Sequence, residues 1–380
     1  MDNWTRSQIF HSGNDFFTSL RADIVAAQKS ITLESYIFAL DRLTEPLLKD
    51  LEEARQRGCT VKIIVDGFGA YENIPALDRI CEKAGIELRV FHPLPYPLLW
   101  FRKMSFLTEG RTLFLFRRVN RRNHRKIVVI DEKVAYLGSI NFIENHCASI
   151  VGDKAWRDTG VRLEGPLVRQ LSLAFQVTYL RTHYRGILSW MNSWKWHPPQ
   201  RSPALYLNTT KNMRKNLYKD ILRRLNHAQH RIYITTAYFL PKRALLRVLL
   251  KAARRGVDVQ ILIPGKSDVP LVKWAAFYIV RFLLKRRIPM YEYQKSILHA
   301  KTMIVDDDVY IGSFNLNHRS IMHDLEVIAR LDDPKSLYDM LQQWHQDIKD
   351  SKSVSEKDFR APSWIARLIY WVAFRLRYML

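Results

Sequence analysis

The feature that most limits how this chain can fold is an internal repeat. A helical pattern, a strand rich in β-branched and aromatic residues, a second helix and a second strand follow one another in residues 14–66 and again in residues 216–264. The second helix of each copy ends in Arg-Gly, at Gly58 and at Gly256, because glycine readily adopts the left-handed conformation that closes a helix. Alternating strands and helices predict an α/β fold with a largely parallel sheet.

The repeat also predicts where the chain divides. We expect a first domain at residues 1–190, a linker at 191–203 and a second domain at 204–350. The stretch around the linker is rich in tryptophan and proline, which fits a connection packed across the two halves. An aromatic surface that touches lipid is the alternative. A separate amphipathic helix is expected at residues 362–380.

Each half carries the same run of polar residues, His-x-Lys-x-x-x-x-Asp followed by Gly-Ser-x-Asn. Side chains alternate along a strand, so the histidine and the lysine of each copy face the same way. One such motif is weak evidence in a long basic chain, but two copies inside a repeat are strong evidence for a site. The first copy consists of His124, Lys126, Asp131, Ser139 and Asn141. The second copy consists of His299, Lys301, Asp306, Ser313 and Asn315.

These residue types fit the transfer of a phosphoryl group. Lysine and asparagine side chains suit the non-bridging oxygens of a phosphate. Of two histidines, a neutral one can attack phosphorus and a protonated one can protonate the leaving alcohol, since the free pKa of about 6.5 allows both forms. Asp131 and Asp306 end their strands, so a structural role in the following turn is favoured, although both belong to the motif and are retained as catalytic candidates.

A carboxylate follows each motif at a matching place. Asp158 and Glu326 coincide when the two halves are aligned on the Arg-Leu pairs that follow them, Arg162-Leu163 and Arg330-Leu331. An acid at this position can accept a hydrogen bond from the second nitrogen of a catalytic histidine and so fix its tautomer. We therefore expect Asp158 and Glu326 to orient the two histidines.

The charge of the chain points to an anionic partner. There are 60 Lys and Arg residues against 37 Asp and Glu residues, a formal net charge of +23, which attracts nucleic acid, anionic lipid or phosphorylated substrates alike. The hydrophobic content of 47% excludes a disordered chain. The three cysteines are expected to be reduced thiols in a cytosolic environment, without structural zinc.

Three apolar segments next to basic clusters predict contact with a membrane surface. Segments 91–116 and 270–287 each precede one motif, and segment 364–380 places three arginines on one arc of a helix. For the first two segments a buried core helix is the alternative. None of these segments has the roughly 20 apolar residues of a membrane span, and the N-terminus lacks the apolar region of a secretory signal. The contact is therefore expected to be peripheral.

The duplicated motif resembles that of the phospholipase D superfamily, and within it the chain looks most like the short bacterial cardiolipin synthases. The resemblance covers roughly residues 10–345. It rests on residues 33–38, 65–69, 123–131 and 157–166 as well as on the second motif. It implies two pseudo-symmetric α-β-α domains packed around one shared active site.

The resemblance also implies roles for the motif residues. Catalysis in the superfamily is ping-pong and uses neither a metal nor a cofactor. His124 is expected to be the nucleophile and His299 the general acid and then base. The phosphate is expected to contact Lys126, Lys301, Asn141 and Asn315, with Ser139 and Ser313 as minor contacts.

The function expected from this resemblance is transfer of a phosphatidyl group to a lipid or alcohol hydroxyl through a phosphohistidine. A phospholipase D-type hydrolase and a phosphatidylserine synthase carry the same motif and remain alternatives. A nuclease of the same superfamily and a non-catalytic lipid-binding protein are alternatives from other classes. We expect an anionic phospholipid membrane and phosphatidylglycerol as partners, no nucleic acid, and a peripheral location on the cytoplasmic face of the cell membrane. The acceptor alcohol and the oligomeric state are left open.

Overall fold

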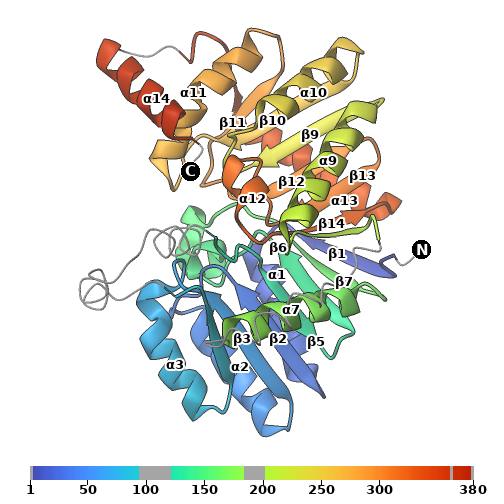
Figure 1. Cartoon of the computed structure of the whole chain (residues 1–380), viewed down its shortest axis with the longest axis vertical. Helices are drawn as coiled ribbons and strands as arrows, with labels where there is room; N and C mark the ends of the chain where they lie inside the picture. Colours follow the sequence, from blue (N-terminus) through green and yellow to red (C-terminus); the bar gives the residue numbers. More distant parts are fainter. Residues whose placement is uncertain (1–2, 94–120, 184–201, 360–362, 378–380) are drawn as a thin grey trace, which may run out of the picture.

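The computed structural model describes residues 3–93, 121–183, 202–359 and 363–377. These residues form two β-sheets with helices on their faces, and Figure 1 shows the half built from the earlier residues below the half built from the later ones. The α/β class and the division into two similar halves are therefore confirmed. Most of the predicted linker and nearly all of the apolar segment 91–116 lie outside the described residues.

The first sheet belongs to the N-terminal half. The strand that belongs to the first motif lies in the middle of this sheet. From one edge to the other it contains β1 (Arg6–Phe10), β7 (Gly160–Glu164), β6 (Val134–Gly138), β5 (Ile127–Ile130), β2 (Ser30–Ser35), β3 (Thr60–Asp66) and β4 (Glu87–Phe91).

The second sheet repeats this order and adds a strand at one edge. Its last strand begins at residue 351, just beyond the predicted limit of the second domain. From edge to edge it contains β15 (Ser351–Ser353), β11 (Met290–Tyr293), β10 (Asp258–Pro264), β9 (Arg231–Thr236), β12 (Lys301–Val305), β13 (Asp308–Gly312), β14 (Val327–Leu331) and β8 (Leu205–Leu207).

The expectation of a largely parallel sheet is wrong, because most strand pairs of each sheet are antiparallel. The pairs β2–β3, β3–β4, β9–β10 and β10–β11 are parallel, and the other strand pairs in the described residues are antiparallel. The reason lies in the connections, since parallel neighbours need a helical crossover whereas a short turn joins antiparallel strands. Each motif strand, β5 or β12, runs through such a short turn into its neighbour.

Helices cover the outer face of each sheet. Buried side chains of α1, α2 and α3 pack on the first sheet, and those of α9, α10 and α11 pack on the second. The outer helices are α1 (Gly13–Ala26), α2 (Thr44–Gln56), α3 (Ile74–Lys83), α9 (Lys211–His227), α10 (Arg243–Arg254) and α11 (Pro270–Leu284). The remaining α-helices described are α6 (Ala148–Val151), α7 (Val168–His183), α12 (His318–Met322), α13 (Pro334–Lys349) and α14 (Trp364–Leu376).

One hydrophobic core is shared by both halves. It contains Ile127 and Leu137 from the first sheet, Ile304 and Ile311 from the second, and Trp344 from α13, all at most 4% exposed. Burial of such side chains is the main favourable contribution to folding. The shared core therefore fixes the two motif strands relative to each other, which is what a single site built from two halves requires.

The C-terminal helix lies on the outside of the second half. The rings of Phe277 and Tyr370 are 4.6 Å apart, those of Tyr278 and Phe374 are 5.6 Å apart, and Ala373 of α14 is buried. In Figure 1 this helix crosses beside α11 at the end of the molecule far from the first sheet. The contacts hold one face of α14 against the protein and leave the rest of the helix outside.

The structure corrects the expectation for segment 270–287. Its helix, α11, buries Val272, Phe277, Val280 and Leu283 in the core of the second half, while Trp274 is 41% exposed. The alternative of a buried core helix is thus the right one, because most of the apolar side chains of this segment pack inside the protein. Among the described residues no helix combines the length and the hydropathy needed to cross a bilayer.

Candidate active site

Both motifs begin where one half touches the other. The backbone amide of His124 donates to the carbonyl of Leu325 over 3.0 Å, and the amide of His299 donates to the carbonyl of Arg157 over 2.8 Å. Leu325 immediately precedes Glu326, and Arg157 immediately precedes Asp158. Each histidine is therefore aligned, backbone to backbone, with the acidic segment of the opposite half.

The histidines and the predicted orienting acids form two crossed pairs. His299 Nδ1 lies 2.7 Å from Oδ2 of Asp158, and His124 Nδ1 lies 3.1 Å from Oε2 of Glu326. The four side chains are buried, with the residues exposed by 8% or less. The structure thus brings together both predicted histidines and both predicted acids, and each pair takes one member from each half.

The surroundings of His124 fix its tautomer. Its Nδ1 also lies 3.1 Å from the backbone carbonyl oxygen of Ser313. A carbonyl oxygen only accepts hydrogen bonds, so Nδ1 carries the proton and donates it. In the neutral ring Nε2 is then left with its lone pair, as a nucleophile requires.

The two motif serines hold the acids in place. Ser139 Oγ donates to Asp158, and Ser313 Oγ donates to Glu326. Ser320, which the sequence did not single out, donates to the other oxygen of Glu326 over 2.6 Å. The hydroxyl groups of Ser139 and Ser313 were expected as minor phosphate contacts, but their contacts in the structure are with the carboxylates.

The motif lysines lie beside their histidines, as the two-residue spacing predicts. Nζ of Lys126 donates to the carbonyl of His124 over 2.8 Å, and Nζ of Lys301 donates to the carbonyl of His299 over 2.6 Å. Burial, together with the mutual repulsion of the two ammonium groups, lowers the pKa of Lys126 to about 7. Burial also lowers the pKa of Lys301 to about 8, although Asp158 opposes the shift.

The two asparagines are buried next to the motif strands. Asn141 accepts a hydrogen bond of 3.4 Å from the amide of Ile37, while Oδ1 of Asn315 has no hydrogen-bond partner among the described residues. A buried amide group without a partner is unfavourable unless a ligand or water completes it. Asn315 is therefore suited to contact a bound substrate.

Asp131 and Asp306 lie apart from this group, at the opposite ends of the motif strands. Asp131 accepts hydrogen bonds of 2.7–2.9 Å from the backbone amides of residues 28–30. Asp306 accepts bonds of 2.7–3.2 Å from the amides of residues 229–231. Both have positive φ, 52° and 53°. Their contacts are those of turn residues, so the structure does not bring these two catalytic candidates to the histidines.

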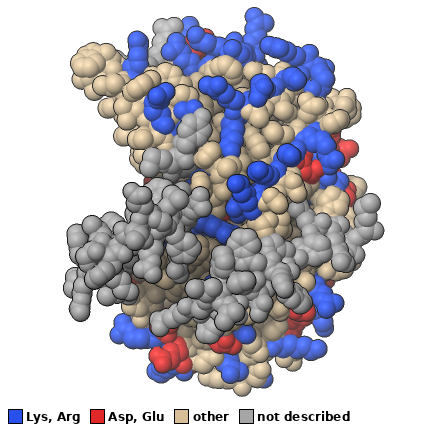
Figure 2. Space-filling model, in the orientation of Figure 1, with Lys and Arg blue, Asp and Glu red and all other residues tan. Residues whose placement is uncertain are grey.

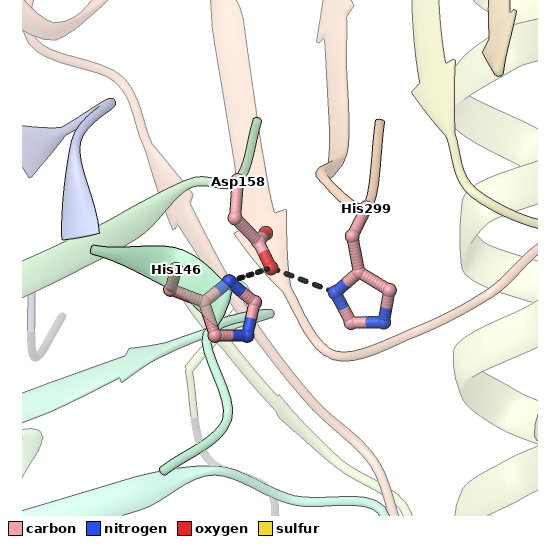
Figure 3. A group of neighbouring side chains, drawn as sticks. All are labelled: His146, Asp158 and His299. Carbon is pink, nitrogen blue, oxygen red and sulfur yellow. Dashed lines mark hydrogen bonds and ion pairs between the residues drawn. The ribbon is translucent and has the colours of Figure 1, made fainter. Parts of the chain in front are cut away.

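Sequence reasoning missed His146, which joins the Asp158 pair. Figure 3 shows the carboxylate of Asp158 between the rings of His146 and His299. Nδ1 of His146 is 3.5 Å from Oδ2 of Asp158, and Nε2 of His146 accepts a hydrogen bond of 3.2 Å from the amide of Asn141.

The nitrogen and oxygen atoms of this trio lie within 4.8 Å of one another, close enough to be compared with a metal site. Because the amide of Asn141 donates to Nε2 of His146, the proton of that ring is on Nδ1, which faces Asp158. Nδ1 of His299 faces the same carboxylate. Nδ1 of His299 donates a hydrogen bond to Asp158, and Nδ1 of His146 faces the same carboxylate at 3.5 Å without a hydrogen bond. A metal ion would need the lone pairs of both nitrogens, so the trio fits a carboxylate held between two imidazoles better than a metal centre.

Comparison with known proteins agrees with this geometry. A family model described as cardiolipin synthase, PLD-like domain, matches residues 20–155 and 221–349, one segment in each half. Cardiolipin synthase B of Salmonella typhi is 31% identical over 365 residues, covering 94% of this chain and 84% of the relative. The chain belongs to the cardiolipin synthase family of phospholipase D-like enzymes.

Other members and solved structures extend the likeness. Cardiolipin synthase 1 of Staphylococcus aureus is 29% identical over 92% of this chain and 69% of its own length. The crystal structure of phosphatidylserine synthase from Haemophilus influenzae superposes with a TM-score of 0.74, covering 100% of this chain and 97% of the other, at 12% identity. Identity this low shows a common fold alone. The two-domain arrangement around one site is thus the family's fold.

In this member of the cardiolipin synthase family the two pairs differ in charge. Burial favours the neutral form of Asp158, but the neighbouring imidazoles of His299 and His146 outweigh it and hold the pKa of Asp158 well below its usual range. Burial raises the pKa of Glu326 to about 7, and Lys126 opposes that shift only in part. Asp158 is therefore an anion at neutral pH, while Glu326 is partly protonated.

The two histidines differ accordingly. Burial, together with Lys126 and Lys301, lowers the pKa of His124 well below its usual value. Burial and Lys301 also lower the pKa of His299, but Asp158 opposes this shift through its charge and its hydrogen bond. Of the two rings, His299 is better placed to hold a proton, because its partner Asp158 is ionised whereas Glu326 is partly protonated.

Proposed function

We propose that this chain transfers a phosphatidyl group between alcohols through a covalent intermediate on His124. The observation that carries the proposal is the pair of crossed contacts, His124 with Glu326 and His299 with Asp158. These contacts place two oriented imidazoles and two lysines in one buried site. That is the set of groups that attack on phosphorus and protonation of a leaving alcohol require.

In the first half-reaction Nε2 of His124 attacks the phosphorus of a phospholipid. The nitrogen lone pair forms the N–P bond, and the bond from phosphorus to the headgroup oxygen breaks. His299 gives its proton to that oxygen, so the headgroup leaves as a neutral alcohol. The ammonium groups of Lys126 and Lys301 and the side-chain NH2 group of Asn315 stabilise the negative charge on the non-bridging oxygens.

In the second half-reaction an acceptor hydroxyl takes the place of the headgroup. His299, now neutral, removes the proton of the hydroxyl as its oxygen attacks phosphorus. The N–P bond then breaks and its electron pair returns to Nε2 of His124. The partners of the two rings support this division of roles, because the ionised carboxylate of Asp158 favours a proton on His299, whereas burial raises the pKa of Glu326 to about 7.

We propose phosphatidylglycerol as the phosphatidyl donor and cardiolipin as the product. The support comes from the curated relatives, which are named cardiolipin synthases and match most of this chain. Hydrolysis to phosphatidic acid and transfer to serine use the same chemistry with water or serine as acceptor. The acceptor therefore has to be found by product analysis.

We also propose that the chain acts at the cytoplasmic face of the cell membrane as a peripheral protein. The net charge of +23 supports attraction to anionic lipid. The exposed face of α14 supports contact with the membrane interface, since Trp364 is 74% exposed, Leu368 52% and Trp371 50%. These large side chains lie on the surface of a helix whose other face is packed on α11.

The decisive experiment is lipid analysis after incubation of the purified protein with phosphatidylglycerol vesicles. We expect cardiolipin and glycerol from the wild type and neither from His124→Ala or His299→Ala. Phosphatidic acid alone would indicate a hydrolase, and phosphatidylserine formed only with added serine would indicate the synthase. Cleavage of single-stranded DNA without any lipid product would overturn the proposal in favour of a nuclease.

The covalent step is tested on the same protein by rapid quenching at alkaline pH, where phosphohistidines are stable, followed by mass spectrometry of peptides. We expect a phosphatidyl adduct on the peptide that contains His124. An adduct on the peptide that contains His299 would reverse the assigned roles. Direct transfer without any adduct would contradict the two-step reaction.

A further inference from the structure

The second half carries a large groove that the catalytic group does not use. It has a volume of about 1030 Å³ and lies between α10, α11, α14 and the start of α12. Pockets that hold small molecules usually measure roughly 300–1,000 Å³, so this groove is at the upper end of that range. Its apolar lining consists mainly of Leu246, Leu250, Ile279, Phe282 and Phe374.

The rim of the groove is basic. None of the described residues that line it is Asp or Glu. Aromatic rings support two of the cations, because the guanidinium of Arg377 lies 3.8 Å from the ring centre of Phe374 and that of Arg375 lies 5.5 Å from Trp371. Figure 2 shows Lys and Arg side chains gathered over this end of the molecule. The rim cations are Lys242, Arg243, Arg247, Arg375 and Arg377.

An apolar floor below a cationic rim is complementary to an amphiphile with an anionic head. The floor accepts hydrocarbon chains and the rim attracts a phosphate, whereas nucleic acid or a soluble phosphate ester would have no use for the apolar floor. The charge and the lining together therefore favour an anionic phospholipid as the occupant.

One end of the groove reaches the helix that we expect to touch the membrane. Phe374, Arg375 and Arg377 line the groove, and they belong to the same helical segment whose other side chains are exposed. A lipid that leaves the bilayer beneath α14 would therefore meet apolar surface at once. The exposed apolar residues of α14 are Trp364, Ile365, Leu368, Ile369, Trp371, Val372 and Leu376.

The other end is formed by segments that continue directly from the active site. His318 lines the groove and follows Asn315 by three residues. Lys242 also lines it and follows Tyr238, whose ring centre is 6.4 Å from that of His299. The lining of the groove thus includes residues that are close in sequence to the active site as well as residues of the helix at the surface.

We propose that this groove holds the acyl chains of the phospholipid substrate while its phosphate is in the active site. This inference rests on the proposed function. Its physical reason is the burial of the histidines, of which His124 is 8% and His299 4% exposed. A phosphodiester that reaches them draws its chains out of the bilayer, and exposure of those chains to water is unfavourable. The groove offers the chains an apolar surface instead.

The test measures lipid binding without turnover. A lysophosphatidylglycerol with a fluorescent acyl chain, kept below its micelle concentration, is titrated with the full chain and followed by fluorescence anisotropy. We expect Ala244→Trp, which fills the groove, and Arg247→Glu, which reverses the charge of an exposed rim residue, each to weaken binding by about tenfold or more. Val25→Trp, at a 52% exposed position of α1 in the other half, serves as the matched control and should bind like the wild type.

Further variants separate the competing explanations. If Leu368→Glu weakens the binding measured by anisotropy as strongly as the groove variants do, the lipid lies on the outer face of α14 and the proposal is wrong. Equal binding by all variants, or no binding by the wild type, also overturns it. Melting temperatures identify a variant that fails to fold. If Ala244→Trp fails to fold, Arg247→Glu decides the test, because the exposed side chain of Arg247 can be replaced without disturbing the core. Since no turnover is measured, a lack of transferase activity would refute the proposed function without deciding this test.

Activity provides a second readout. Ala244→Trp should lower kcat/KM for long-chain phosphatidylglycerol in vesicles by about tenfold, while cleavage of bis(p-nitrophenyl) phosphate, which has no acyl chains, should stay within about twofold of wild type. An equal loss on both substrates would mean that the substitution damages the catalytic group, which overturns the assignment of the groove to acyl chains.

Discussion

Oδ2 of Asp158 lies 2.7 Å from Nδ1 of His299, although the two residues are 141 positions apart in the sequence and belong to different halves. Glu326 and His124 repeat the contact in the opposite direction, at 3.1 Å. A substitution of either acid should therefore act on the histidine of the other half.

Asp158→Asn should lower kcat on the order of 10³-fold to 10⁴-fold, the size of effect seen when an orienting carboxylate is lost from a catalytic triad. The amide can donate to Nδ1 of His299 and so favour the wrong tautomer. The measurement is the initial rate of cardiolipin formation from phosphatidylglycerol vesicles. A loss smaller than about tenfold would show that His299 does not depend on this carboxylate.

Glu326→Gln is the matched variant of the second pair, and its kcat should fall by a smaller factor, roughly 10-fold to 100-fold. The carbonyl of Ser313 still accepts the proton of His124 Nδ1 when the carboxylate is replaced. The neutral amide also resembles the partly protonated Glu326, whose pKa is raised to about 7 by burial. A loss as large as that of Asp158→Asn would contradict the asymmetry between the two pairs.

The rate should fall on the alkaline side because the phosphate-binding lysines lose their charge. The pKa of Lys126 is lowered to about 7 and that of Lys301 to about 8, in both cases mainly by burial. A lysine is protonated below its pKa, so both charges are present below pH 7 and both are depleted above pH 8. We expect kcat/KM to decline across this range, measured between pH 6 and pH 9.5.

Lys126→Arg tests the assignment of this decline. Arginine keeps its charge at any pH used, so only Lys301 should titrate and the decline should begin about one pH unit later. A profile identical to that of the wild type would place the titrating group elsewhere.

Asp131→Ala and Asp306→Ala should each lower the free energy of unfolding by about 1–3 kcal/mol, because each removes the acceptor of several backbone amides. The specific activity of the folded protein should stay within about twofold of wild type, since neither carboxylate contacts the histidines. Urea unfolding and the activity assay on the same preparations check both statements. Asp153→Ala, at an exposed position, is the control for stability. A large loss of kcat without a loss of stability would restore these residues to the catalytic group.

Leu368→Glu combined with Trp371→Glu should reduce sedimentation with anionic vesicles by about tenfold or more, because both side chains are about half exposed on α14. The melting temperature should not change, since the face of α14 that packs on α11 is left intact. Tyr338→Glu, at a 63% exposed position of α13, is the matched control. Unchanged sedimentation would mean that α14 is not the membrane contact.

Much of this fold and site could be read from local patterns. The repeat and the paired His-x-Lys motifs predicted two similar halves around one site, because strand periodicity and residue spacing are properties of the sequence itself. The strand directions were harder. Both halves contain helical crossovers, which favoured parallel pairing, but the short turns at Asp131 and Asp306 reverse the chain and make the neighbouring pairs antiparallel.

Other features depend on contacts between distant residues. A run of apolar residues beside a basic cluster has the same sequence pattern whether it faces lipid or the protein core. The prediction of a lipid-facing segment was therefore wrong for α11, whose burial is shown only by the packing of Phe277 and Val280. The crossing of each acid to the opposite half cannot be inferred from spacing, since either partner is compatible with the alignment of Asp158 and Glu326. His146 was missed for the same reason.

Because of the shared core and the crossed pairs, the catalytic group is complete only when both halves are folded and in contact. If either half comes loose, His124 and His299 each lose the carboxylate that orients them, so the failure of one half disables both histidines at once. A partly folded or clipped chain would then be inert toward phospholipid rather than half-active.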